Sequence, residues 1–189
     1  MRKSIISLLA VLSLTVLLGG VAAAQDRAPE IALAKLQRTC QAASQSGCLA
    51  EVVVLTPQGV MELAGSSCRQ VRAVAVYALG EMGESRAVEL LVILLQDPDR
   101  HIRRIAVRAL GKIGDPRALE PLAAVLVNDN EDLSVRCAAA WALGGLGDPR
   151  AHEALRSAAN SPHGRLNRAS REAADRLEGA GVNVSSSSL

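Results

Sequence analysis

The chain has 189 residues, with 21 basic and 19 acidic side chains and a formal net charge of +2 at pH 7. A charge so close to balance gives no general attraction to nucleic acid, so we predict no nucleic-acid partner. The sequence holds one Trp, one Tyr and no Phe. Because a globular enzyme of this size usually buries several aromatic anchors, the composition favours a stacked helical array.

Residues 1–24 have the three-part layout of a secretory signal peptide. Arg2 and Lys3 supply the positive start, an apolar run covers residues 5–18, and Ala22-Ala23-Ala24 offers a small-residue cleavage site before Gln25. The run is shorter than the roughly 20 residues of a membrane helix. We therefore predict a periplasmic or secreted chain, formally neutral and without a membrane span after cleavage. A retained N-terminal anchor is the alternative.

The segment 28–70 is predicted to form an N-terminal helical cap with a partial repeat. A helix is expected over 28–46, since a 3.6-residue period brings four small or apolar side chains to one face. These are Leu33, Leu36, Cys40 and Ala43. The short apolar stretch 50–55 is left unassigned.

The four cysteines all follow the predicted cleavage site, and an even number in an exported chain suggests a disulfide. Cys68 and Cys137 are expected at the starts of helices two repeats apart, which is beyond the roughly 7 Å limit between bridged α-carbons. We predict one bridge among Cys40, Cys48 and Cys68, with the pairing left open, and a free thiol at Cys137.

One pattern occurs three times, over 71–83, 102–114 and 135–147, at offsets of 31 and 33 residues. These offsets match the length of one helical hairpin. Apolar residues at relative positions 0, 4, 7, 8 and 11 form a stripe with helical period. A single hairpin cannot bury such a stripe, so the copies are predicted to stack as a solenoid. Glycines at positions 9 and 12 of the pattern are expected to end each helix.

The turns between the copies predict where the partner helices begin. Gly-Asp-Pro-Arg-Ala occurs at 114–118 and at 147–151, with Asp as a suitable N-cap and Pro at the first helical position. Asp99 and Asp132 are expected to cap the repeated helices. A fourth, highly charged copy over 166–178 has Asp175 and Glu178 at the glycine positions, which suits a terminal cap facing water. The serine-rich end, 180–189, is predicted to be a disordered tail.

The pattern resembles the HEAT-like repeats of the phycobilisome-lyase type, which occur in many bacterial interaction proteins. The resemblance covers residues 71–155 and is weaker on both sides. It implies an all-α, right-handed α-solenoid of about four helical hairpins, with repeats over 71–179. It also implies that the arginines at position 1 pair with acidic side chains of neighbouring turns, while a ligand-binding role for them is the alternative. These arginines are Arg72, Arg103 and Arg136, and the expected partners are Asp97, Asp99, Asp129 and Asp132.

The resemblance extends to iron-dependent hydroxylases, which hold two metals through His-Glu pairs early in the second helices of several repeats. Here those positions hold Ala73-Val74, Arg104-Ile105 and Cys137-Ala138, and the three histidines occupy different places in the repeat. The sequence shows no catalytic triad and no phosphate-binding glycine loop. We therefore predict no catalytic residue, no metal, no cofactor and no enzymatic activity.

A candidate binding surface lies at position 6 of the repeated helices, roughly 200° from the centre of the apolar stripe. Tyr77 and Trp141 occupy this position and Arg108 is their equivalent in the middle copy, with Arg104 and Glu81 beside them. Tyr, Trp and Arg are enriched at binding hot spots. We predict that Tyr77, Arg104, Arg108 and Trp141 bind a protein on the concave face. The alternative is that the large side chains fill space between repeats.

Together these observations predict a non-enzymatic interaction module or scaffold of the cell envelope, with a protein or peptide bound to its concave face. The alternative is an enzyme or enzyme accessory of the HEAT-like lyase or hydroxylase type that uses a metal or a thiol, for which Cys137 is the candidate.

Overall fold

The computed structural model describes residues 27–45 and 56–185, and every regular element in these ranges is a helix. The α-helices are α2 (Arg27–Gln45), α3 (Pro57–Ala64), α4 (Arg69–Met82), α5 (Val88–Ile93), α6 (Arg100–Ile113), α7 (Leu119–Val127), α8 (Leu133–Leu146), α9 (His152–Ala158) and α10 (Gly164–Ser185). Short 3₁₀ turns flank several of them. The prediction of an all-α solenoid is confirmed. The predicted signal peptide, the stretch 50–55 and Cys48 lie outside the described residues.

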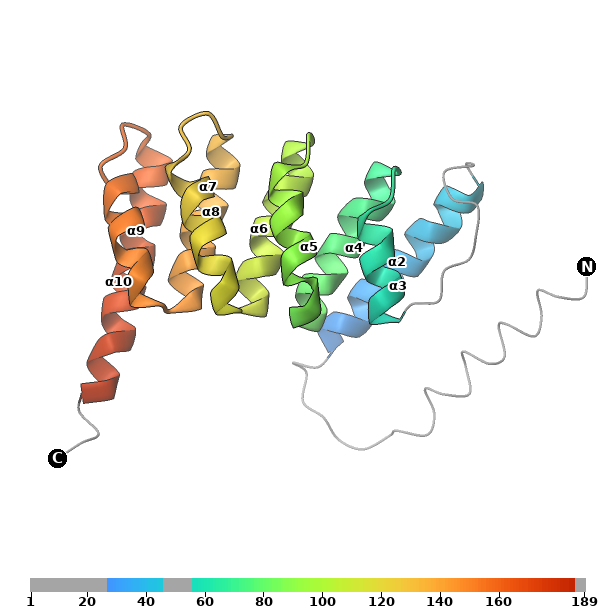
Figure 1. The fold of residues 1–189 in the computed structure, drawn as a ribbon, viewed down its shortest axis with the longest axis horizontal. Helices are drawn as coiled ribbons and strands as arrows, with labels where there is room; N and C mark the ends of the chain where they lie inside the picture. Colours follow the sequence, from blue (N-terminus) through green and yellow to red (C-terminus); the bar gives the residue numbers. More distant parts are fainter. Residues whose placement is uncertain (1–26, 46–55, 186–189) are drawn as a thin grey trace, which may run out of the picture.

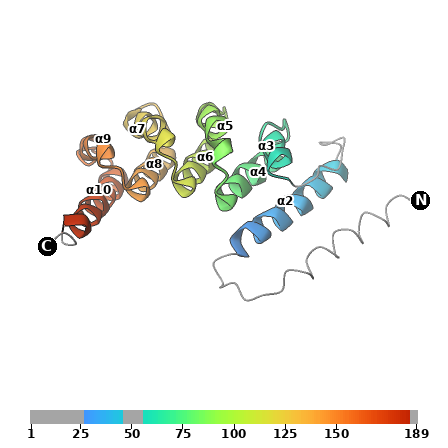
Figure 2. The ribbon, with the colours of Figure 1, turned by 60° about the horizontal axis from the view of Figure 1, so that its bottom comes forward.

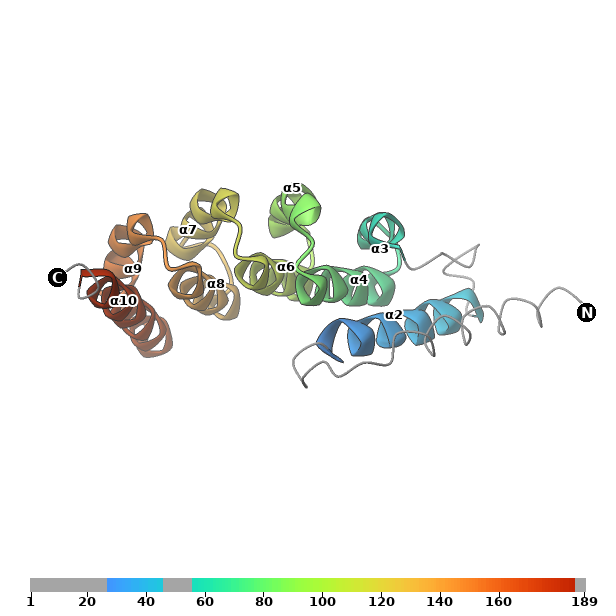
Figure 3. The ribbon, with the colours of Figure 1, turned by 90° about the horizontal axis from the view of Figure 1, so that it is seen from below.

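The helices form two layers (Figure 1). Figures 2 and 3 show α3, α5, α7 and α9 in an outer row, and α2, α4, α6, α8 and α10 in an inner row that follows a shallow arc. Each hairpin takes one helix from each row, which gives the hairpins α3–α4, α5–α6, α7–α8 and α9–α10. The first hairpin therefore begins at Pro57, within the segment assigned to the N-terminal cap, and α2 packs against α4 at the end of the stack.

Two kinds of residue end and begin the helices as predicted. The carboxylates of Asp99 and Asp132 each accept a hydrogen bond of 2.8 Å from a backbone N–H two residues on, at the starts of α6 and α8. Gly83, Gly114 and Gly147 end α4, α6 and α8 with φ of 64°, 71° and 68°. Because only glycine adopts this left-handed conformation without strain, the position-12 glycines act as C-caps.

The glycines at position 9 have a different role from the one expected. Gly80, Gly111 and Gly144 lie inside their helices, so the prediction that they end them is wrong. A Cβ atom on each would lie 2.7–2.8 Å from an alanine of the next inner helix, which is too close for any side chain. These glycines allow neighbouring inner helices to touch backbone to backbone. In the last copy the position holds Asp175, and among the described elements no further helix packs there.

The apolar stripes of the repeats form one continuous core. Leu79, Leu110 and Leu143 at position 8 are fully buried, as are the position-0 residues Val71, Ile102 and Val135. Helix α2 contributes Ala32, Leu36 and Ala43 to this core, which agrees with the predicted helix over 28–46. At the other end α10 continues to Ser185, so the first part of the segment 180–189 is helical and not a disordered tail. Residues 186–189 lie outside the described part of the chain.

The position-1 arginines connect each helix to an adjacent acidic turn, as the resemblance implied. Arg72 Nε lies 2.9 Å from Asp97 Oδ2, without the alignment of a hydrogen bond, and Arg136 Nη1 lies 2.8 Å from Asp129 Oδ1. Arg103 departs from the expected set, because its guanidinium donates two hydrogen bonds, of 2.8 and 2.7 Å, to Glu131. The alternative of a ligand-binding role is disfavoured, since each of these arginines also donates to a backbone carbonyl of the preceding turn or helix end.

The other two aspartates that were expected to bind these arginines, Asp99 and Asp132, form a second set of pairs between repeats. Asp99 pairs with Arg69, and Asp132 pairs with Arg100 at 3.0 Å. Cys40 and Cys137 hold free thiols. Burial and the nearby Cys68 raise the pKa of the Cys40 thiol. Of the predicted bridges, the one between Cys48 and Cys68 stays a prediction, because Cys48 lies outside the described residues.

Candidate functional site

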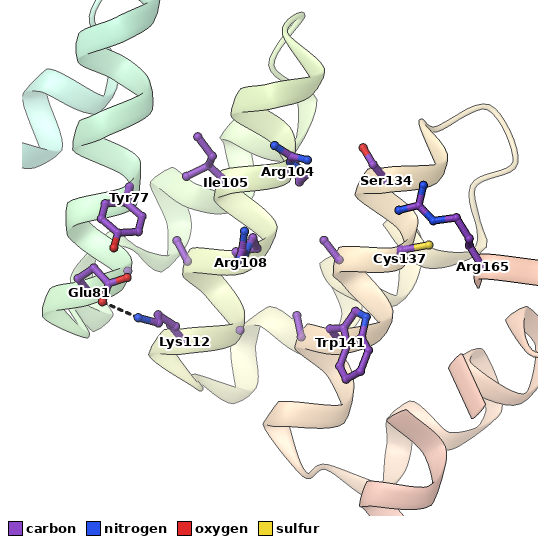
Figure 4. Close-up of a pocket in the computed structure, with 15 residues that line it drawn as sticks. Tyr77, Glu81, Arg104, Ile105, Arg108, Lys112, Ser134, Cys137, Trp141 and Arg165 are labelled. Carbon is purple, nitrogen blue, oxygen red and sulfur yellow. Dashed lines mark hydrogen bonds and ion pairs between the residues drawn. The ribbon is translucent and has the colours of Figure 1, made fainter. Parts of the chain in front are cut away.

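A groove of about 860 Å³ runs across the inner row on the concave side of the array. Its walls come from α4, α6 and α8 and from the start of α10 (Figure 4). Tyr77, Arg104, Arg108 and Trp141 all line it, and so does Glu81. The fold therefore brings the four candidate residues into one depression, although they come from three different helices.

Each aromatic ring of the groove is covered on one side by a cation from the neighbouring helix. Lys35 Nζ of α2 lies 5.7 Å from the centroid of the Tyr77 ring, and Arg176 Cζ of α10 lies 4.1 Å from the centroid of the Trp141 ring. Tyr77 and Trp141 are nevertheless 41% and 40% exposed. Each ring therefore packs against the neighbouring helix and keeps one face accessible in the groove. The binding of a protein to these faces stays a prediction.

An ion pair lies at one end of the groove. Lys112 Nζ lies 2.5 Å from Glu81 Oε2. Partial burial, and then the nearby carboxylate of Glu81, raise the pKa of the Tyr77 phenol. Glu81 is thus paired with Lys112 and not with Arg108.

The middle of the groove holds two arginines that differ from the others of the central repeats in having no carboxylate partner. Between residues 69 and 150, eight arginines form ion pairs with carboxylates: Arg69, Arg72, Arg86, Arg100, Arg103, Arg117, Arg136 and Arg150. Among the described residues, Arg104 and Arg108 have no such partner. The nearest polar contact of Arg104 is His101, whose Nδ1 lies 3.2 Å from Arg104 Nη2.

A third arginine of the groove without a carboxylate partner, Arg165, was not predicted from the sequence. Its exposed side chain extends from the start of α10 toward Ser134 and Cys137 on α8 (Figure 4), and it forms no ion pair within the described part of the chain. The register of the fourth copy could have indicated it, because Arg165 directly precedes Leu166 as Ser134 precedes Val135. A second hollow of about 500 Å³ shares Arg104, Ser134 and Arg165 with the groove and extends it toward the Arg69–Asp99 and Arg100–Asp132 pairs.

Cys137, the thiol candidate, also lines the groove. Burial raises the pKa of this thiol, and the opposing effects of Arg165 and Arg136 are smaller. Because the thiolate is the nucleophilic form, a raised pKa leaves Cys137 mostly protonated and weakly reactive at neutral pH.

In the described ranges, no three or more His, Cys, Asp or Glu side chains lie close enough together to hold a metal ion. The positions that carry His-Glu pairs in the hydroxylases here hold apolar residues, an arginine and Cys137. His152 does contact a carboxylate, that of Glu178 at 3.1 Å, but on the outer side of the last hairpin. The donor set therefore does not fit a two-metal centre.

No described helix combines the length and the apolar character that crossing a bilayer requires.

Comparison with known families agrees with this architecture. A family described as HEAT repeats matches residues 57–133, and the family of PBS lyase HEAT-like repeats matches residues 135–161. No curated protein matched the sequence.

Solved structures with this arrangement include two enzymes. Human deoxyhypusine hydroxylase, in complex with glycerol, superposes with a TM-score of 0.61 at 21% identity over 81% of this chain and 63% of its own. The complex of CpcE and CpcF of phycocyanin lyase from Nostoc sp. PCC7120 gives a TM-score of 0.59 at 20% identity over 87% of this chain and 68% of that one. An engineered protein gives 0.54 at 21% identity, over 66% and 63%. The chain spans less than two thirds of the hydroxylase and of the engineered protein.

These structures correct the prediction that the chain is not an enzyme. That prediction rested on the repeat array and on the absence of a recognisable catalytic constellation. A hydroxylase and a lyase share the array, so the array is not evidence against catalysis. At 20–21% identity the likeness establishes the fold and assigns no particular reaction.

Proposed function

We propose that this chain, which belongs to the HEAT-like repeat proteins, works as an enzyme subunit or enzyme accessory that holds a segment of a protein in its concave groove. One observation carries the proposal. Tyr77, Arg108 and Trp141 come from three successive repeats, line one groove and stay accessible there. A row of exposed Tyr, Arg and Trp side chains is typical of the centre of a binding surface.

The chemistry of the groove supports a role in binding and orienting a substrate. Its walls supply aromatic faces and guanidinium groups, both of which bind ligands without reacting with them. The thiol of Cys137 has a raised pKa, which favours a positioning role for the groove over thiol catalysis.

The lyase structure supports the presence of a protein partner, because there CpcE is in complex with CpcF. By analogy, this chain acts together with a second protein that is its substrate or its catalytic companion. Because the sequence predicts a signal peptide, we include in the proposal that this pair works in the cell envelope.

Photo-crosslinking tests the proposal. A photoreactive amino acid replaces Trp141 in the groove, and in a matched control it replaces Ile93, which is 69% exposed on α5 of the outer row. We expect one protein to be captured from position 141 and not from position 93. The captured protein is then purified, and its enzymatic turnover or modification is compared with and without this chain. Equal capture from both positions, or turnover that is independent of the chain, would overturn the proposal.

A further inference from the structure

We infer that the segment held in the groove is acidic, with its carboxylates paired to Arg104, Arg108 and Arg165. This inference rests on the proposed function and names the chemistry of the partner. Its starting point is a contrast within the chain. Between residues 69 and 150, eight of the ten arginines have carboxylate partners, and the other two, Arg104 and Arg108, both line the groove.

The charges that line the groove and its extension are unbalanced. Three carboxylates line them, and each is already bound to a cation: Glu81 to Lys112, Asp99 to Arg69 and Asp132 to Arg100. The three remaining guanidiniums, those of Arg104 and Arg108 on α6 and Arg165 on α10, have no carboxylate as an ion-pair partner within the described part of the chain. A ligand with carboxylates would neutralise them, and each guanidinium can bind a carboxylate through two parallel hydrogen bonds.

The spacing of the arginines suits an extended peptide. Arg104 and Arg108 lie four residues apart on α6, a rise of about 6 Å along the helix axis. Side chains on one face of an extended peptide repeat every second residue, or about every 6.6–6.8 Å. Acidic residues at alternate positions of the peptide can therefore meet both arginines. Two cations so placed repel each other in the free protein, and bound carboxylates would relieve that repulsion.

The shape of the site favours a peptide over a small anion. The groove of about 860 Å³ continues into a hollow of about 500 Å³, and the two share Arg104 and Arg165. The exposed face of Trp141 lines the same groove and offers a contact for an apolar residue of the same segment. We therefore expect acidic residues at alternate positions, followed by an apolar or aromatic residue.

Peptide binding to the full-length protein tests the inference. The probe is a fluorescent peptide with Glu at three alternate positions and a terminal Leu, compared with the same peptide carrying Gln and with a labelled oligothymidylate. We expect the Glu peptide to bind at least tenfold more tightly than the other two, and to weaken as salt screens the charges. Equal binding of the Glu and Gln peptides, or tighter binding of the oligonucleotide, would overturn the inference.

Charge variants locate the binding. The double variant R104Q/R108Q should weaken binding of the Glu peptide at least tenfold. The control R117Q/R150Q removes the same charge from the 3₁₀ turns before α7 and α9, outside the groove, and should change the affinity less than twofold. If both double variants lose affinity equally, the inference is wrong. Thermal melts check folding. R165Q, which changes one exposed side chain at the start of α10, should weaken binding by itself and provides the same test should R104Q/R108Q unfold.

The two proposals can fail separately. If crosslinking from position 141 captures a partner whose turnover depends on this chain, and the Glu peptide does not bind, only the acidic segment is ruled out. If position 141 captures nothing that position 93 does not capture, the function itself is ruled out, whatever the peptide does.

Discussion

Gly111 of α6 lies so close to Ala142 of α8 that a methyl group added to the glycine would lie 2.7 Å from the alanine Cβ and 2.9 Å from its Cα. The same contact joins Gly80 to Ala109 and Gly144 to Ala173. The inner helices therefore cross with almost no side chain between them. Every residue of the groove projects from this closely packed row, so the glycines at position 9 support the geometry of the candidate site.

The variant Gly111→Ala tests this contact. Alanine favours a helix more than glycine does, but here its Cβ would meet backbone and Cβ atoms that cannot move without shifting a helix. We expect a net loss of about 1–3 kcal/mol in the free energy of unfolding, as for an overpacked core. Chemical denaturation measures it.

Gly145→Ala is the matched control. Gly145 lies one residue after a position-9 glycine, inside α8, and a Cβ there meets nothing within 4 Å. This change should stabilise the protein by up to about 1 kcal/mol, through helix propensity alone. If Gly111→Ala also stabilises the protein, the backbone contact between α6 and α8 is not as close as the structure has it.

The variant Leu110→Asp tests how far one repeat depends on its neighbours. Leu110 is fully buried on the stripe of α6. A carboxylate there would be unpaired, at a cost of several kcal/mol, which is comparable with the whole stability of a small domain. We expect hydrogen exchange to show lost protection in α4 and α8 as well as in α6. Val127→Asp, at a residue that is 48% exposed, should leave protection unchanged. Loss confined to α6 would contradict the cooperative stacking.

The variant Trp141→Ala separates packing from binding. The ring is 40% exposed and Arg176 covers one face. Its removal should cost about 1 kcal/mol of stability, the size of a partly exposed cation–π contact. The free energy of binding to the partner should become less favourable by about 2 kcal/mol or more. Leu143→Ala, fully buried on the same helix, should instead cost about 2–5 kcal/mol of stability. An equal loss of stability in both variants, with partner binding retained, would make Trp141 a packing residue.

Acid should weaken the fold through the helix caps. Hydrogen bonds from the Ser134 side chain and backbone, with a smaller effect of Arg100, lower the pKa of Asp132 to about 2. Side-chain hydrogen bonds from Arg69, Arg117 and Arg150, and then capping backbone N–H groups, lower the pKa of Asp99, Asp115 and Asp148 in the same order. A lowered pKa means that folding favours the charged carboxylate. The stabilisation is complete above the unfolded-state pKa of about 4 and is lost as the pH falls toward 2.

Melting temperatures between pH 7 and pH 2 check this prediction. The wild-type protein should lose most stability below pH 4. Asp132→Asn keeps a side chain that caps a helix but cannot titrate, so its melting temperature should depend less on pH over that interval. A variant whose curve runs parallel to the wild type would show that Asp132 does not contribute to the acid sensitivity.

Export is a prediction of the sequence that the described residues do not address. Cleavage after Ala24 would make Gln25 the first residue of the mature protein. N-terminal sequencing of protein from the periplasmic or secreted fraction should find Gln25. Recovery of the uncleaved chain from the membrane fraction would instead favour the N-terminal anchor.

Much of the architecture could be read from the sequence because it depends on local rules. The repeat offsets of 31 and 33 residues define the hairpins, the apolar stripe identifies the buried face, and Asp and Gly mark the ends of helices. Tyr77, Arg108 and Trp141 were placed on one surface for the same reason: in a regular stack, one position of the repeat always faces the same side.

Only the tertiary structure decided which neighbour each side chain meets. The position-9 glycines look like helix ends in the sequence, and only the crossing of α6 and α8 shows that they make room for an alanine. Arg103 was expected to bind an aspartate and instead binds Glu131. Arg104 and Arg108 look like other arginines of the repeat until the ion pairs of the described residues are known, and Arg165 joins them from the last hairpin, α9–α10. Helical period determines the direction of a side chain along its own helix, whereas the distance between two helices and the pairing of charges depend on how separate repeats pack together.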